Sequence, residues 1–127
     1  MAVIGVGIDL IEIDRIAQAL ARRPRFAERC FTPAEAAYCQ SRAFPAQHFA
    51  ARFAAKEAVG KALGIGMTRW REVEVVRGPA GAPSVALTGR YARRSEDLGI
   101  TSISVSLTHS RGTAAAVAVA EAHDRAA

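Results

Sequence analysis

The chain has 127 residues, of which 50% are hydrophobic and 23% charged, and its net charge is +5. This length and balance exclude a repeat array and a disordered tail, and they predict one domain over residues 1–127. The positive charge favours an anionic partner, which leaves open a phosphorylated small molecule, an acidic protein, a nucleic acid or a membrane surface.

The first predicted element is a mostly buried strand over residues 3–11. Its glycines, Gly5 and Gly7, would allow a neighbouring backbone to come close. Asp9 interrupts the apolar run, and a carboxylate in such a setting must be paired, hydrogen-bonded or bound to a metal. Capping of a nearby turn is the simplest alternative for Asp9.

Two short helices are expected next. Asp14 is a candidate cap for a helix over residues 15–22, which Pro24 would end. Residues 32–40 open with Thr-Pro-Ala-Glu, in which a capping box is combined with proline at the first helical position. This opening predicts a second short helix over that segment.

The longest helix is expected over residues 46–63, and its many alanines allow close packing on several faces, so we expect it to be central. Residues spaced four apart form one stripe along it: Phe49, Phe53, Glu57 and Lys61. The simplest interpretation of the last two is a surface ion pair worth about 0.3–0.5 kcal/mol. If Glu57 instead meets Asp9 in space, the two carboxylates form a hard oxygen site that suits Mg²⁺.

Beyond this helix, strand signals predominate. The expected elements are a hairpin of strands 72–76 and 84–87, a helix over 89–98, and strands over 100–108 and 114–120. Residues 121–127 are expected to fray. Strands and helices without regular βαβ alternation predict an α+β fold, with a largely antiparallel sheet packed on the long central helix.

Other features narrow the class and the location. No apolar run approaches the about 20 residues of a membrane span, and the N-terminus lacks the basic region of a signal peptide. Cys30 and Cys39 lack zinc-ligand spacing. One disulfide is possible by number, but without a secretory signal two reduced, partly buried thiols are favoured. We therefore predict a cytoplasmic protein with no membrane partner.

Two polar features remain without a fixed role. His109 ends a predicted strand in a turn of small polar residues, where it could face a ligand, although a lone histidine is more often structural. The basic stretch over residues 15–29 is either a solvated helical face or a docking surface for an acidic partner.

Several segments together resemble the holo-[acyl-carrier-protein] synthases, the small bacterial 4′-phosphopantetheinyl transferases. Residues 5–16, GVGIDLIEIDRI, resemble the opening strand motif of this family, and residues 25–35 match its next segment. Residues 51–64 match its signature, in which the pattern W/F-x-x-K-E-(A/S)-x-x-K marks the wider superfamily. The resemblance continues through residues 104–110 and covers nearly the whole chain in the right order.

The resemblance implies a 4′-phosphopantetheinyl transferase fold that forms a homotrimer, with active sites at the subunit interfaces. It also implies a Mg²⁺-dependent activity, with Mn²⁺ as a possible substitute. The enzyme would transfer 4′-phosphopantetheine from coenzyme A to a serine of apo-acyl carrier protein, leaving adenosine 3′,5′-bisphosphate. The pathway would be fatty acid or polyketide biosynthesis.

The resemblance assigns roles to single residues. Asp9 and Glu57 would hold Mg²⁺ with the coenzyme A pyrophosphate, and Lys61 would contact the transferred or leaving phosphate. Either Glu57 or a carboxylate-bound water would accept the serine proton. Coenzyme A contacts are expected at Arg52, Lys56, Lys61, Gly64, Pro83 and His109. The acidic carrier protein would bind Arg15, Arg25, Phe26 and Arg29.

Two rival functions belong to other classes. A nucleic-acid-binding module would explain the abundant arginine, but aromatic residues make up only 6% and no RNP-like or zinc-finger pattern is present. A subunit that binds coenzyme A without transferring a group is disfavoured by the presence of both carboxylates and Lys61. We therefore expect no nucleic-acid partner.

Overall fold

The structure, a computed structural model, describes residues 1–123. Its elements are β1 (Ala2–Glu12), α1 (Ile13–Arg22), α2 (Phe26–Cys30), α3 (Pro33–Gln40), α4 (Pro45–Leu63), the 3-10 turn η1 (Trp70–Glu72), β2 (Val73–Arg77), the 3-10 turn η2 (Pro79–Gly81), β3 (Pro83–Leu87), α5 (Gly89–Asp97), β4 (Ser102–His109) and β5 (Thr113–Ala122). Residues 121 and 122 belong to β5 rather than to a frayed tail, and residues 124–127 lie outside the described part.

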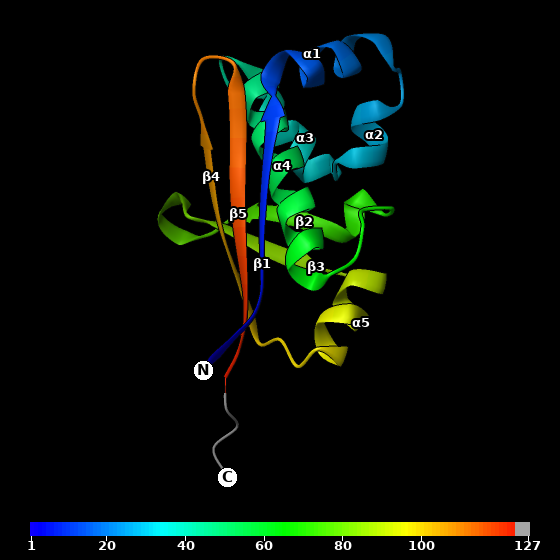
Figure 1. Cartoon of the computed structure of the whole chain (residues 1–127). Helices are drawn as coiled ribbons and strands as arrows, with labels where there is room; N and C mark the ends of the chain where they lie inside the picture. Colours follow the sequence, from blue (N-terminus) through cyan, green and yellow to red (C-terminus); the bar gives the residue numbers. More distant parts are fainter. Residues whose placement is uncertain (124–127) are drawn as a thin grey trace.

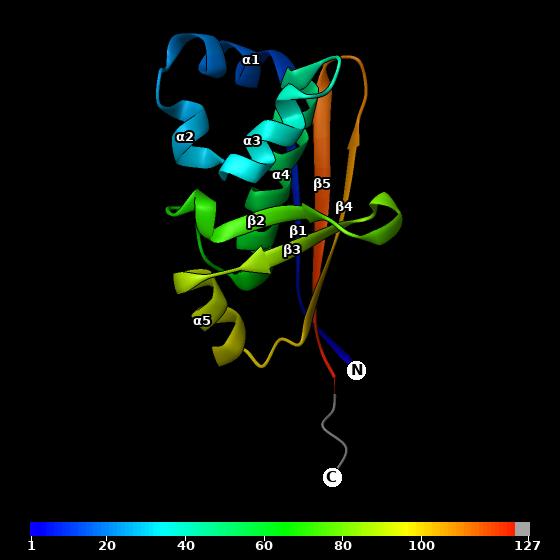
Figure 2. The ribbon, with the colours of Figure 1, turned by 180° about the vertical axis from the view of Figure 1, so that it is seen from behind.

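The strands form a three-stranded sheet in the order β1-β5-β4 and a separate β2-β3 hairpin, and every pairing is antiparallel. Helix α4 contacts both the three-stranded sheet and β2 (Figures 1 and 2). The views from opposite sides place the sheet on one side of α4 and the hairpin with α1 to α3 on the other. The predicted α+β fold with antiparallel strands is confirmed.

The contact between β1 and α4 is a backbone contact. A Cβ atom added to Gly5 would lie 2.0 Å from the carbonyl oxygen of Ala62, and one added to Gly7 would lie 1.8 Å from that of Ala58. Real Cβ atoms do not approach an oxygen this closely, so only glycine fits at these two positions. The strand and the helix are therefore held in a fixed register.

The start of α1 differs from the prediction. The helix begins at Ile13 after Glu12, whose side chain makes no capping hydrogen bond. Asp14 is not the cap, because it lies inside the first turn and accepts a hydrogen bond from Gln18 at 2.7 Å. The chain enters α1 directly from β1, so no loop residue is available to cap it.

The predicted capping box at α3 is confirmed. The Glu35 backbone N–H donates to Thr32 Oγ1 at 3.2 Å, and the Thr32 N–H donates to Glu35 Oε1 at 2.8 Å. The prediction of two reduced thiols is also confirmed, since Cys30 and Cys39 are buried and free. Burial raises the pKa of the Cys39 thiol to about 11. No helix among the described residues is long and apolar enough to cross a bilayer.

Candidate active site

The backbone contact between β1 and α4 places Asp9 beside the polar end of α4. Gly5, Gly7 and Asp9 alternate along β1 and so share the strand face that packs on the helix. The Lys61 Nζ atom donates to the Ile8 carbonyl oxygen at 2.8 Å and to Asp9 Oδ1 at 3.3 Å. The Asp9 side chain is 20% exposed and that of Lys61 is 54% exposed. The pair is therefore open to a ligand.

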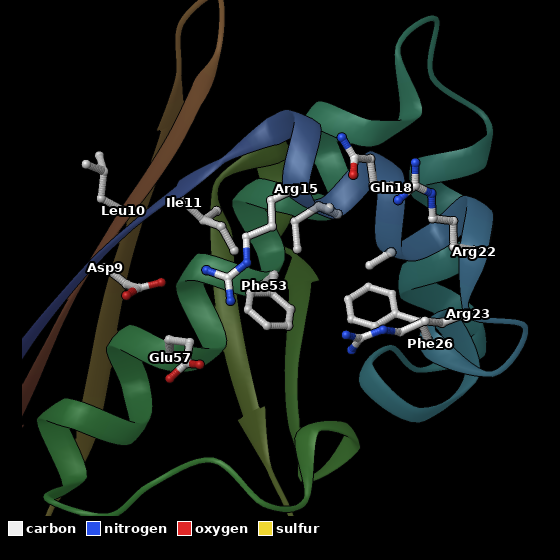
Figure 3. Close-up of a pocket in the computed structure, with 12 residues that line it drawn as sticks. Asp9, Leu10, Ile11, Arg15, Gln18, Arg22, Arg23, Phe26, Phe53 and Glu57 are labelled. Atoms are coloured by element: carbon white, nitrogen blue, oxygen red, sulfur yellow. The ribbon is translucent and has the colours of Figure 1, made fainter.

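Asp9 and Glu57 line one pocket of about 420 Å³. Figure 3 shows both carboxylates at one end of this pocket, with Arg15 and Phe53 beside them. The fold therefore brings together the two carboxylates that the sequence separates by 48 positions along the chain. Lys61 forms its ion pair with Asp9. Within residues 1–123 it forms no ion pair with Glu57, so the simple surface pair considered in the sequence analysis is not present.

The two carboxylates at one end of the pocket favour a cation between them. Burial raises the pKa of the Glu57 carboxyl above its usual value, the Asp9 carboxylate raises it further, and the Lys61 ammonium lowers it. The Asp9 carboxylate therefore opposes the ionisation of Glu57, and a divalent ion between the two side chains would remove that penalty. No group of three or more His, Cys, Asp or Glu side chains within residues 1–123 could hold a metal. Two carboxylates, with waters and substrate phosphates completing the shell, suit Mg²⁺.

The residues expected to receive a carrier protein lie around this pocket. Arg15 and Phe26 line it, whereas Arg25 and Arg29 line an adjoining groove that Phe26 shares. Phe26 stacks on Phe53 with ring centroids 5.9 Å apart. The basic stretch is therefore continuous with the candidate site.

Arg52 lies on a different side of α4 from Glu57, because five residues turn a helix by about 140° beyond a full turn. Its guanidinium carbon lies 4.3 Å from the ring centroid of Tyr38, and its buried Nε atom has no hydrogen-bond partner. Arg52 is absent from the Asp9–Glu57 pocket. The structure thus places a buried, incompletely satisfied cation away from the two carboxylates.

Three other expected coenzyme A contacts also lie outside this pocket. Gly64 ends α4 with φ +72°, and Pro83 opens β3 opposite Arg77. His109 ends β4 with its ring centroid 6.0 Å from that of His48, a neighbour that sequence reasoning missed. Burial lowers the pKa of His48, and nearby Arg52, Arg42 and His109 lower it further.

The prediction that Lys56 holds a coenzyme A phosphate is wrong in this structure. Lys56 is completely buried, and its Nζ donates to Glu35 Oε1 at 2.7 Å, the Trp70 carbonyl at 2.9 Å and the Val73 carbonyl at 2.6 Å. An ammonium has three protons, so none is left for a substrate. The other oxygen of Glu35 accepts from the Val75 N–H at 2.7 Å. Lys56 therefore joins α4 to α3 and β2.

Sequence reasoning also missed the residues of η1. Trp70 stacks on Phe53 with ring centroids 4.3 Å apart, and its neighbours Arg69 and Arg71 line the same groove as Arg25 and Arg29. The signal that was available is the chain's single tryptophan placed between two arginines just before a strand.

Comparisons with known proteins agree on one family. Residues 5–120 match a model of the 4′-phosphopantetheinyl transferase superfamily. A holo-[acyl-carrier-protein] synthase of Moorella thermoacetica is 50% identical over 117 residues, which cover 91% of each chain. One of Beutenbergia cavernae is 48% identical over 120 residues, covering 94% of this chain and 98% of the relative.

Solved structures give the same result. The crystal structure of a holo-[acyl-carrier-protein] synthase from Neisseria meningitidis superposes with a TM-score of 0.85 at 30% identity, covering 94% of this chain and 99% of the other. The Helicobacter pylori enzyme in complex with coenzyme A gives a TM-score of 0.80 at 31% identity, covering 91% and 99%.

Proposed function

The chain belongs to the 4′-phosphopantetheinyl transferase superfamily, and we propose that the Asp9–Glu57 pocket is the centre of its reaction. The enzyme transfers 4′-phosphopantetheine from coenzyme A to a serine of apo-acyl carrier protein, giving holo-acyl carrier protein and adenosine 3′,5′-bisphosphate. The observation that carries the assignment of the site is that Asp9 and Glu57 line one pocket and that Lys61 donates a hydrogen bond to Asp9. We treat residues 1–127 as one transferase domain.

Asp9 and Glu57 are the residues that would hold Mg²⁺, or Mn²⁺ in its place, since both ions prefer oxygen ligands. The ion supplies charge neutralisation at the coenzyme A pyrophosphate, which is the main requirement of phosphoryl transfer. Lys61 uses two of its three protons on the Ile8 carbonyl and Asp9, and the third can bind the transferred phosphate. Glu57, or a water held beside it, accepts the proton of the attacking serine.

The carrier protein binds beside this centre in our proposal. Arg15, Arg25 and Arg29 present exposed cations, and the half-buried ring of Phe26 gives an apolar contact between them. An acidic surface with apolar side chains would complement this combination. The contact would bring a carrier serine to the mouth of the pocket, because Arg15 and Phe26 line the pocket themselves.

The same proposal includes a homotrimer with active sites at the subunit interfaces. Three side chains on the outer face of β1 are exposed although they are large and apolar: Val6 at 57%, Ile8 at 67% and Leu10 at 71%. An exposed apolar face of this kind is typical of a protein interface. A neighbouring copy could then add coenzyme A contacts that one subunit cannot bring to its own Asp9–Glu57 pocket: Arg52, Gly64, Pro83 and His109.

We place the enzyme in the cytoplasm, because the free buried thiols Cys30 and Cys39 suit a reducing compartment. Its pathway would be fatty acid or polyketide biosynthesis.

A transfer assay tests the proposed function. Purified enzyme is incubated with an apo-acyl carrier protein, coenzyme A and Mg²⁺, and the intact carrier is weighed by mass spectrometry. We expect the carrier to gain one phosphopantetheine and an equal amount of adenosine 3′,5′-bisphosphate to appear. Chelation of the divalent ion should stop both. Failure to modify any of several carrier proteins would contradict the assignment.

A further inference from the structure

A groove of about 1010 Å³ adjoins the candidate active site and has two basic walls. The first wall comes from α1, α2 and the turn between them, and the second comes from the segment around η1. The arginines of the two walls are Arg22, Arg23, Arg25 and Arg29 on the first and Arg69 and Arg71 on the second. Arg71 also shares a smaller hollow with Arg25, Arg29 and the acidic Glu28, so the walls lie close together there, with three arginines against one carboxylate.

Three aromatic rings form the floor of this groove. Phe53 lies between Phe26 and Trp70, with centroid distances of 5.9 and 4.3 Å and interplanar angles of 28° and 20°. All three side chains are only partly buried, so part of each ring remains available to a partner. Phe26 and Phe53 also line the Asp9–Glu57 pocket, and the groove therefore leads directly to that pocket.

The charge of the second wall is not neutralised within the protein. Arg69 and Arg71 are exposed, and neither forms an ion pair with a carboxylate of the described residues. Glu72 is the acidic residue of the groove lining, but its carboxylate accepts the Arg90 backbone N–H at 2.8 Å at the start of α5. Cations facing one another across a groove repel, and an anionic partner between them would relieve the repulsion.

The second wall is held in place by buried hydrogen bonds. Lys56 donates to the carbonyls of Trp70 and Val73, and the Thr68 N–H donates to the hydroxyl of the buried Tyr91 at 2.8 Å. The wall is therefore fixed before a partner arrives, and little ordering entropy is lost on binding. A wall fixed in this way beside an apolar floor fits a folded partner of matching shape better than a flexible one.

We propose that Arg69 and Arg71 form a second docking wall for the acyl carrier protein, which binds between the two walls rather than on α1 and α2 alone. This inference rests on the proposed function. The partner's acidic side chains face both arginine walls, and its apolar side chains contact the ring of Trp70. The pantetheine arm of coenzyme A is an alternative occupant, but it is uncharged and would leave all six arginines unpaired.

The test is charge reversal on the second wall, with the double variant Arg69→Glu/Arg71→Glu. The matched control is Arg93→Glu, because Arg93 is an exposed arginine of α5 that does not line the groove. Transfer rates are measured against carrier concentration and, separately, against coenzyme A concentration, and thermal unfolding checks that each variant folds. If the double variant does not fold, the neutral variants Arg69→Gln and Arg71→Gln replace it.

We expect kcat/KM for the carrier to fall at least about tenfold in the double variant, with the KM for coenzyme A unchanged and the control unaffected. Added salt should weaken carrier binding more steeply in the wild type than in the variant, because the variant has fewer charge contacts that salt can screen. A carrier KM within about twofold of wild type would overturn the inference, as would a rise confined to the coenzyme A KM. If the wild type transfers the group and the double variant is unaffected, only the inference about the second wall is contradicted. If the wild type itself shows no transfer, the proposed function is contradicted.

Discussion

At the residue scale, the site depends on two carboxylates that share one pocket and one neighbouring lysine. Burial and the Asp9 carboxylate both raise the pKa of Glu57, so this side chain takes up a proton at a higher pH than an ordinary glutamate. A protonated carboxyl cannot act as a metal ligand. The metal requirement of the enzyme should therefore depend on pH.

We predict that the Mg²⁺ concentration needed for half-maximal transfer rises as the pH falls from neutral. The sign follows from the raised pKa of Glu57, since the ionised form that binds the cation is lost first on the acid side. Rates measured against Mg²⁺ at several pH values test this expectation. A half-maximal Mg²⁺ concentration that stays constant over the same range would contradict it.

The two lysines give a second prediction, in which each is the control for the other. Lys61 is 54% exposed, so Lys61→Met should leave the unfolding free energy nearly unchanged and lower kcat at least about tenfold. Lys56→Met should lower the unfolding free energy by about 3–5 kcal/mol, because it leaves the Glu35 carboxylate buried without its partner. Chemical denaturation and transfer rates measure the two effects. The reverse pattern would contradict both assignments.

The same residues show what the sequence could predict at this scale. The stripe of four-residue spacing singled out Glu57 and Lys61, and the resemblance added Asp9 to them. Lys56 was misassigned because Glu35 is 21 positions away, and only the folded chain shows that it binds the lysine. A local pattern locates a charged residue on a helix, but not the partner that buries it.

At the element scale, the register of β1 on α4 positions the site. Gly7 gives a direct test, because a Cβ at this position would lie 1.8 Å from the Ala58 carbonyl oxygen. We predict that Gly7→Ala pushes α4 away from β1, lowers the unfolding free energy by about 1–3 kcal/mol and reduces transfer. The matched control is Gly112→Ala, where a Cβ would meet no atom within 4 Å.

Thermal unfolding and transfer rates of the two glycine variants decide this prediction. The control should keep the stability and the activity of the wild type. A Gly7→Ala enzyme with wild-type stability and activity would show that the close contact does not position Asp9.

Most elements could be predicted from local patterns. The capping box fixed the start of α3, and alternating apolar residues located the β2-β3 hairpin and the pair β4-β5. Helix α2 was missed because it has five residues and no cap side chain. Its Phe26 packs edge-on against Phe31 and stacks on Phe53, so tertiary contacts stabilise it.

At the scale of the whole molecule, the net charge of +5 is concentrated where two distant segments meet. Residues 22–29 and residues 69–72 come together only in the fold and form the walls of one groove. The sequence identified the first segment as a possible docking surface, but nothing local linked it to the second. Assembly of a surface from separate segments is what the sequence could not predict.

The exposed apolar face of β1 leads to a prediction about assembly. We expect the wild type to be a trimer by light scattering, and Val6→Glu to dissociate it, because a charge would be buried at the interface. If neighbouring copies share each site, the transfer rate should decrease as the trimer dissociates. Ala37→Glu, an exposed change on α3, is the control and should remain trimeric. A fully active wild-type monomer would contradict the shared site.

The central claim is that Asp9 and Glu57 form the catalytic centre, and transfer kinetics of Asp9→Asn test it most directly. The control is Glu12→Gln, an exposed carboxylate at the end of the same strand. With carrier, coenzyme A and Mg²⁺, intact-mass measurements should show the control converting the carrier at the wild-type rate. The Asp9→Asn enzyme should be at least about a hundredfold slower, since the metal is worth several kcal/mol to the reaction. A near-wild-type rate for Asp9→Asn would contradict the claim.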